Sequence, residues 1–511
     1  MKRLSIIMAA LVVAIAGCHK ELQSNAGNGI DGENVFVSFS IQTIDTKSAT
    51  DNEGGNYGSS DATPDIEVGK DYENKISTVD IVLRSGPTYV SATAVTPEAV
   101  NNPDADKDNY PKKWVAKFNS SLLKAGQEYD IFVYANCNSK QDLDATSSES
   151  IDNMTVKEKF WMTNAYAQSV TFDANATFST DENNPTHIGD VYVERSMARF
   201  DYKPSGAFEI AEGVNITLTE AALINQSKSF YLLRRVSADG TNTGWSVGGA
   251  ETKVNYVVDT DYAAKNNGYQ NTDAANFDNH MSLGIDNLTF KALPTASGEA
   301  DNWEGVGEGA GNFYIWQYAK ENTIPGAFSN QVNGNSTGVI FRGELSGDIV
   351  TAAAGETIYV FNNILYGTWA NVKAAAEVAG APEALKYACA ACTDASGNVI
   401  TGNLASAGFT SYPAVEKDGD GANHYYAYYY YWNRHNDNLN NQDMGKMEFA
   451  VVRNNVYKLY VDSISKYGHP GPGGSDPDPV DPTDPDEQGE YYFSVTVKVV
   501  PWVVRVNHIG W

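Results

Sequence analysis

The chain has 511 residues and carries 36 Lys and Arg against 64 Asp and Glu, which gives a formal net charge of −28. This length accommodates two or three domains with a sizeable core. The negative charge argues against nucleic acid and anionic membrane surfaces as partners and suits a soluble, exposed surface protein. With only 4 Cys, the chain has too few for a disulfide-built scaffold.

The first residues have the features of a secretory signal peptide. Lys2 and Arg3 precede an apolar run over residues 4–15 that is too short to span a bilayer. Directly after Ala16 and Gly17 comes Cys18, and a Cys at this place resembles the lipobox of bacterial lipoproteins, whose thiol is acylated and becomes the new N-terminus. We therefore predict lipidation at Cys18. An ordinary signal peptide with an incidental Cys is the alternative.

A strand is predicted soon after the signal peptide. Val35, Val37, Phe39 and Ile41 alternate with small polar or aromatic residues and so lie on one face. The same pattern occurs at the C-terminus, so either segment could occupy the same kind of hydrophobic groove.

The stretch after this strand, residues 45–69, is polar and Gly-rich and contains a single basic residue, Lys47. Such a loop is a good target for a protease. On residue chemistry alone, Lys47 is better explained as a solvated loop residue.

The middle of the chain reads mostly as strands. The predicted runs are β-branched or aromatic and bounded by turn residues, and they cover residues 76–83, 129–135, 191–202, 214–223, 338–342, 357–362 and 447–464. Many short strands separated by turn-rich segments favour β-sandwiches. Two Ala-rich helices are predicted over residues 369–378 and 382–389, with Pro382 as the first helical residue. A domain boundary is expected near residues 201–206, where Lys203-Pro-Ser-Gly206 interrupts the strand pattern.

Catalytic and metal-binding patterns are absent from the sequence. It contains no HExxH, GxSxG or GxxxxGK[ST] motif. The Gly-rich run at residues 305–311 has no Lys for a phosphate and is better explained as a loop. Cys389 and Cys392 have redox-motif spacing, but without a thioredoxin-like context a structural disulfide or buried thiols are favoured over redox catalysis or zinc. We predict no enzyme activity, no cofactor and no metal.

Residues 425–432 contain six Tyr and one Trp. Such a strand could line a carbohydrate-binding face, but its aromatic residues fall on both sides, which favours core and interface packing.

The C-terminal segment is an additional strand behind a long linker. Residues 468–489 are rich in Pro and Asp, which favours an extended, self-repelling chain. At about 3.1 Å per residue, some twenty such residues reach about 60 Å. Beyond them, Phe493, Val495, Val497 and Val499 alternate with polar residues. A lone strand needs a sheet edge for its backbone groups, so it must fold back on its own domain or enter another subunit. A strand that only closes its own sheet normally follows a turn of about 2–5 residues, so the long tether favours another subunit.

Several ordered segments resemble the major subunits of type V pili. They are residues 428–437, 447–459 and 464–468 near the C-terminus, residues 134–136, 160–164, 193–199 and 321–323 upstream, and Val500-Pro-Trp502 in the last strand. The resemblance implies two transthyretin-like β-sandwich domains and a tethered donor strand in a mostly β protein. It also implies a lipidated precursor in the outer membrane, from which a trypsin-like protease removes the first strand so that a neighbour's C-terminal strand can fill its groove.

The resemblance makes Lys47 the expected cleavage residue and Ser48 the new N-terminus, although the family's best-known members are cut after Arg. The predicted organisation is a signal peptide at 1–17, a propeptide at 18–47, sandwich domains at 48–202 and 203–467, a tether at 468–489 and a donor strand at 490–511. The donor strand carries Phe493, Val495, Val497, Val499 and Trp502.

The expected function is that of a fimbrial shaft subunit on the cell surface, which polymerises with identical or related pilin subunits and supports adhesion to a host or bacterial receptor. The alternatives are a tip or minor adhesin subunit and a surface glycan-binding lipoprotein.

Overall fold

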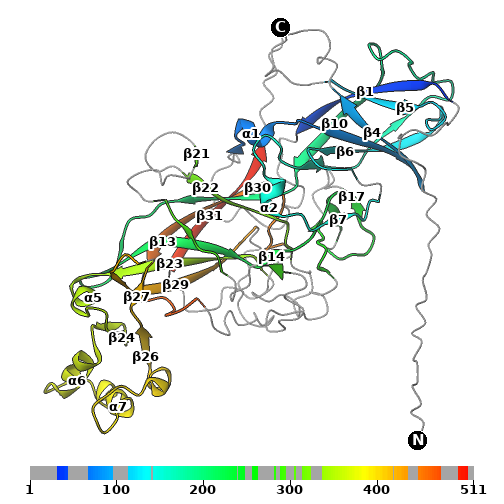
Figure 1. The fold of residues 1–511 in the computed structure, drawn as a ribbon. Coiled ribbons are helices and arrows are strands. Elements are labelled where there is room, and N and C mark those ends of the chain that lie inside the picture. Colours follow the sequence, from blue (N-terminus) through cyan, green and yellow to red (C-terminus); the bar gives the residue numbers. More distant parts are fainter. Residues whose placement is uncertain are drawn as a thin grey trace, which may run out of the picture.

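The structure is a computed structural model, and it describes residues 32–43, 67–95, 113–139, 142–238, 240–247, 256–262, 281–282, 288–294, 304–306, 313–323, 336–417, 419–435, 447–472 and 493–503. Strands dominate these residues, as predicted, and they assemble into several packed sheets (Figure 1). Within the described part, no helix is long and apolar enough to cross a membrane.

The N-terminal unit is built on one eight-stranded sheet. Its order is β3 (Val79–Ser85), β4 (Thr88–Val95), β5 (Lys113–Asn119), β1 (Asn34–Thr43), β10 (Thr186–Arg195), β8 (Met162–Asn164), β6 (Glu128–Ala135) and β9 (Gln168–Thr171). Because β3 also pairs with β6, the strands from β3 through β1 to β6 form a closed circuit. A closed circuit leaves none of these strands with a free edge.

The C-terminal unit has two further sheets around a second core. The six-stranded sheet has the order β2 (Glu67–Val68), β31 (Phe493–Val503), β30 (Asn455–Ile464), β11 (Ala198–Lys203), β22 (Phe313–Ala319) and β21 (Glu304–Val306). The other sheet contains β12 (Phe208–Ala211), β13 (Val214–Ile224), β23 (Gly338–Ser346) and β29 (Tyr426–Trp432), and β20 (Lys291–Ala292) also pairs with β13.

Small elements cover the sides of these sheets. The short strands are β7 (Thr146–Ser147) with β15 (Phe230–Tyr231), β14 (Gln226–Ser227) with β19 (Met281–Ser282), β16 (Arg235–Ser237) with β17 (Ser246–Val247) and β18 (Tyr256–Val257), and β27 (Val415–Glu416) with β28 (Asn423–His424). The short helices are α1 (Asp71–Asn74), α2 (Ile151–Met154) and α5 (Asp348–Ala352).

Two predicted strands differ from the structure. Residues 191–202 are not one strand, because β10 and β11 belong to different sheets and Ser196 and Met197 separate them. Residues 447–464 are strand only over β30, since the chain turns at Met447 and Asn454, both with positive φ. The domain division at 202/203 stays a prediction, and the change of sheet falls a few residues before it.

A compact insertion separates β23 from β29, although these two strands pair directly with each other. It contains β24 (Ile358–Phe361), β25 (Ile364–Tyr366), α6 (Trp369–Glu377), α7 (Glu383–Ala391), two 3₁₀ turns (Thr401–Asn403 and Ala405–Ala407) and β26 (Phe409–Tyr412). We call residues 356–412 the knob. Its helices are close to those predicted, but Pro382 caps α7 instead of starting it.

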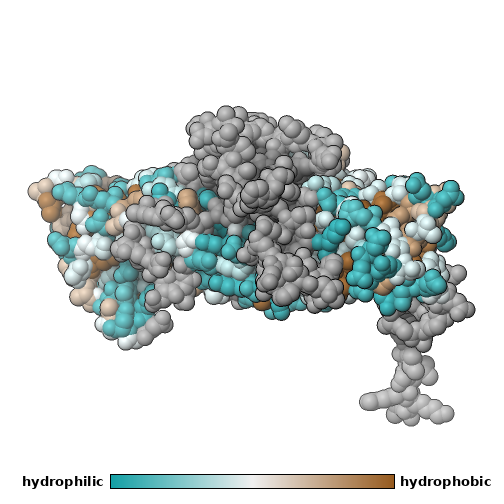
Figure 2. All heavy atoms as spheres, turned by 90° about the horizontal axis from the view of Figure 1, so that it is seen from above, coloured by the Kyte–Doolittle hydropathy of each residue, from teal (hydrophilic) through white to brown (hydrophobic). Residues whose placement is uncertain are grey.

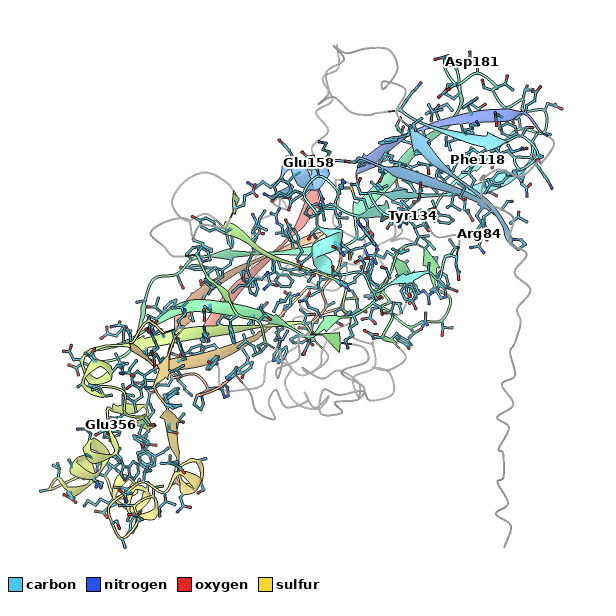
Figure 3. The ribbon with its side chains drawn as sticks, viewed as in Figure 1. Arg84, Phe118, Tyr134, Glu158, Asp181 and Glu356 are labelled. Carbon is cyan, nitrogen blue, oxygen red and sulfur yellow. The ribbon has the colours of Figure 1, made fainter. Side chains whose placement is uncertain are left out.

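The knob has its own hydrophobic core, formed around Trp369, Phe361 and Phe409. The Trp369 and Phe409 ring centroids lie 5.3 Å apart in an edge-on arrangement. The knob and the eight-stranded sheet lie at opposite ends of the molecule (Figure 1). In Figure 3, Phe118 marks the β5 end and Glu356 the start of the knob.

Candidate assembly site

The first strand, β1, occupies an interior position in its sheet. It pairs antiparallel with β5 from Asn34 to Ser40, and parallel with β10 from Val37 to Thr43. A further backbone hydrogen bond runs from the Phe36 N–H to the Ser179 carbonyl at 2.8 Å. β1 is therefore the strand that joins β5 to β10.

The four apolar residues predicted on one face of this strand are all buried. Val37 and Phe39 are 0% exposed, and Val35 and Ile41 are nearly so. They belong to the same core as Phe118 of β5 and Val191 of β10. Burial of an aliphatic or aromatic side chain of this size contributes about 1.5–3 kcal/mol. Removal of β1 would thus expose an apolar slot bordered by two unpaired strand edges.

The opposite face of β1 is also covered, which the alternation did not predict. Ser38 and Ser40 are buried, and the Ser38 hydroxyl lies 3.4 Å from Nδ1 of His187. A strand that takes the place of β1 must therefore present small side chains on this face.

The last strand, β31, has a partner in its own chain, so the prediction that it finds no edge there is wrong. It pairs antiparallel with β30 from Phe493 opposite Ile464 to Pro501 opposite Asn455. The pairing could not be inferred from the sequence, because the tether separates the two strands along the chain. In the fold, β30 is covered by β11 on one side and offers β31 its other edge.

The register on β30 matches the alternation predicted for the donor strand. Val495, Val497 and Val499 lie opposite Val461, Leu459 and Tyr457. Those three β30 side chains are fully buried. β31 is nevertheless close to being an edge strand, since on its other side β2 pairs only with Trp502 and Val503. Pro501, which has no N–H to donate, is tolerated at such an edge.

The Tyr-rich strand is part of the interior, as its two-sided pattern favoured. Tyr425 and Tyr429 pack in the main core of the C-terminal unit, and Tyr426 and Tyr428 pack with Ile340 in a smaller cluster. All four of these Tyr residues are buried. They therefore offer no open platform for a sugar ring.

The segments shared with the pilin family contain buried charges whose role the sequence did not reveal. Arg199 pairs with Glu73 at 2.9 Å and with Asp201 at 2.8 Å, and all three side chains are fully buried. The Tyr318 hydroxyl donates to Glu73 at 2.6 Å, and burial raises the pKa of Tyr318, so it remains a neutral donor.

A second buried pair joins Arg453 to Glu321 at 2.6 Å. Arg453 also donates to the carbonyl of Leu232 at 3.0 Å. Leu232 packs in the core of the N-terminal unit, so this network fixes the two units to each other. Loss of one partner from a buried pair costs about 3–5 kcal/mol, because the other charge remains without compensation.

The remaining predicted positions give little further information. Cys389 and Cys392 are free, buried thiols in and after α7. Cys18, Lys47 and Ser48 lie outside the described residues. No group of His, Cys, Asp and Glu within the described ranges is arranged to hold a metal ion.

Comparison with known proteins identifies the C-terminal region. Residues 423–508 match the family described as major fimbrial subunit protein type IV, fimbrillin, C-terminal. The match contains β29, β30 and β31, which are the Tyr-rich strand and the two strands paired at the C-terminus. No curated protein matches the chain.

Several solved structures are similar over most of their length. A candidate cell adhesion protein from Bacteroides eggerthii is 12% identical with a TM-score of 0.33, and the match covers 94% of this chain and 99% of the other. A fimbrilin from Porphyromonas gingivalis is 13% identical with a TM-score of 0.30, over 92% and 98% of the two chains. A fimbrial assembly protein from Parabacteroides distasonis is 10% identical with a TM-score of 0.23, over 61% and 96%.

Identities and TM-scores this low support no further conclusion, so the family match carries the assignment. The resemblance to fimbrial subunits is confirmed by that match: residues 423–508 of this chain are similar to the C-terminal region of the fimbrillin major fimbrial subunits.

Proposed function

We propose that this protein is the shaft subunit of a surface fimbria and polymerises by donor-strand exchange. The precursor is exported as a lipoprotein through Cys18 and held in the outer membrane. A trypsin-like protease cuts after Lys47, β1 leaves, and the C-terminal strand of another subunit takes its place. The polymer then supports adhesion to a host or bacterial surface.

The observation that carries this proposal is the position of β1 in a closed circuit of strands. Only three residues separate Thr43, the end of β1, from Lys47. A cut there frees the strand from the chain but leaves its ladders to β5 and β10 intact. The exposed core of an empty slot is unfavourable, so exchange requires an incoming strand that restores both ladders and the apolar contacts.

The incoming strand must first leave its own subunit. β31 gives up one ladder, to β30, and a short contact with β2. In the slot it gains two ladders, because it lies between β5 and β10. Its Val495, Val497 and Val499 alternate with Ser494, Thr496 and Lys498, so at most positions small side chains would meet the covered opposite face. This gain in backbone pairing favours the exchanged state.

Analysis of isolated fibres tests the processing step. Mass spectrometry is expected to find an N-terminus at Ser48 and no peptide from residues 34–43. Lys47→Ala is expected to leave the propeptide attached and the protein monomeric, whereas Lys70→Ala, at the next basic residue, serves as the matched control and should assemble normally. Fibres that retain residues 34–43 would exclude a vacated first-strand slot.

A peptide of residues 490–503 tests the exchange step. Protein cleaved at Lys47 is expected to bind this peptide and to release residues 34–43 in return, which is followed by size-exclusion chromatography and mass spectrometry. The same peptide with Val497→Asp is the control and should not bind, because an unpaired carboxylate in an apolar slot costs several kcal/mol. Binding of both peptides alike would contradict recognition of the apolar face.

A further inference from the structure

The knob carries an unusual share of the apolar surface among the described residues. Among all the described residues, the exposed large hydrophobic side chains are Val95, Val156, Ile349, Ile364, Val378, Tyr387, Ile400 and Val415. Four of them lie on the knob and two, Ile349 and Val415, flank it. Tyr387 is 74% exposed and Val378 is 60% exposed. Scattered apolar residues are normal on a surface, but half of those found in the described residues fall within this one insertion, which makes its surface the first place to look for a contact.

The C-terminal sheet does not require the knob. β23 and β29 pair directly from Gly338 opposite Trp432 to Glu344 opposite Tyr426. Such a hairpin normally closes with a loop of about 2–5 residues. Instead, the chain makes a separate unit whose own core already buries Trp369, Val372 and Phe409. The exposed apolar side chains are thus left over after the knob has folded, and they are available to a partner.

The position of the tether indicates which partner this is. The described start of the tether, residues 468–472, lies against the base of the knob. The hydroxyl of Tyr412, the last residue of the knob, donates to the Gly468 carbonyl at 2.5 Å. His469 and Tyr428 exchange two backbone hydrogen bonds at 2.8 and 2.9 Å, and the Tyr430 hydroxyl donates to the Pro472 carbonyl at 3.0 Å.

The receiving slot lies at the other end of the molecule. Figure 1 places β1 and β5 at the end opposite α6 and α7, and brown atoms are visible at both ends of the molecule in Figure 2. A donor strand that swings out on a tether anchored beside the knob places the receiving slot, at the β1 end of the next subunit, within about 60 Å of that knob.

We propose that the knob is a second contact between successive subunits, which rests on the N-terminal unit of the copy that receives the donor strand. This inference depends on the proposed strand exchange. A strand on a tether of some twenty residues fixes the connection between two subunits but not their orientation. An apolar contact at the root of the tether fixes the orientation and makes the fibre stiff.

Charge reversal on the knob surface tests the proposal. Tyr387→Glu combined with Val378→Glu changes only exposed positions, so the monomer should unfold at the same temperature as wild type. On gels of samples that were not boiled, we expect the heat-sensitive ladder of polymers to remain, because the strand and the slot are unchanged. In electron micrographs, the fibres should become markedly more flexible. Lys291→Glu, at an exposed position of β20 in the C-terminal unit and outside the knob, is the matched control. Straight wild-type fibres from the double variant would overturn the proposal.

A photoreactive amino acid at position 387 identifies the partner directly. The expected product joins two copies and maps to residues 48–202 of the second copy. A product with any other protein, or no product in assembled fibres, would contradict the proposal. Crosslinks between copies without a heat-sensitive ladder would support the knob contact and contradict strand exchange, whereas a ladder without such crosslinks would do the reverse.

Discussion

The first and last strands of this chain have similar alternation but occupy different positions in their sheets. β1 has a neighbour along both edges and closes a circuit of strands, whereas β31 is paired along one edge and touches β2 at only two residues of the other. The strand that is easily released is therefore the last one. The strand whose loss creates a strong need for a replacement is the first one.

This difference accounts for the direction of the proposed reaction. Exchange of one edge strand for another would leave the number of ladders unchanged. A move from an edge position to an interior position adds a ladder of backbone hydrogen bonds, each worth about 0.5–1.5 kcal/mol net. In this proposal, cleavage after Lys47 is needed because β1 would otherwise compete for the slot as part of the same chain, at a high effective concentration.

The largest effect is expected from a charge within β1. Phe39→Asp places a carboxylate at a fully buried position of the closed circuit, so the precursor should lose several kcal/mol and fail to accumulate. Asn34→Asp, at the exposed start of the same strand, is the control and should stay within about 0.5 kcal/mol of wild type. Urea unfolding of the purified precursors measures both. A stable Phe39→Asp precursor would mean that β1 is not essential to its sheet.

The second prediction contrasts the two faces of the last strand. Val497→Asp should abolish the polymer ladder, since the carboxylate would have to enter the apolar slot. Thr496→Asp should reduce assembly less, because in the slot Thr496 would lie on the face of Ser38 and Ser40, which is covered but borders the polar side chain of His187. Gel electrophoresis without boiling measures both. Equal polymer ladders from the two variants would show that the slot does not distinguish the apolar face of the strand from its polar face.

The sequence predicted the local pattern of these strands better than their partners. Alternation alone placed Val35, Val37, Phe39 and Ile41 on a buried face, and the structure confirms it. It could not show that β31 pairs with β30, because a tether of this length allows either an intramolecular or an intermolecular edge. β30 itself gave a signal, since Tyr457, Leu459 and Val461 also alternate.

Charged and inserted residues were harder to interpret. Arg199 and Arg453 stood out in the sequence only as part of a family resemblance, although each forms a buried ion pair, with Glu73 and Glu321 respectively. An Arg in a strand is ordinarily solvated, and its buried carboxylate partner, Glu73 or Glu321, lies more than a hundred residues away. The knob helices were predicted, but a separate unit inserted between two paired strands was not.

An engineered disulfide between β30 and β31 provides the third prediction. Leu459 and Val497 are directly opposite in the antiparallel pair, at a Cα separation of about 4.5–5.5 Å that suits a disulfide. Leu459→Cys with Val497→Cys should therefore hold β31 on β30 under oxidising conditions and prevent polymerisation, and dithiothreitol should restore the ladder. Each single Cys variant serves as a control and should polymerise with or without reductant. Polymer formation by the oxidised double variant would show that β31 need not leave β30.

The smallest effect is expected from shortening the tether, because this changes neither the strand nor the slot. Deletion of residues 476–485 removes about half of its length and lowers its reach from about 60 Å to about 30 Å. The monomer should keep its unfolding temperature, because the deleted residues are predicted to make no core contacts, whereas the rate of polymerisation should fall. Replacement of the same ten residues by a Gly/Ser linker of equal length is the matched control and should restore most of the rate, although a flexible chain spans less distance than an extended Pro-rich one. The polymerisation rates are compared by stopping assembly at successive times, at equal subunit concentration, and measuring the fraction of polymer. An unchanged rate in the shortened variant would mean that a reach of about 30 Å is enough to bring the strand to the slot of the next subunit.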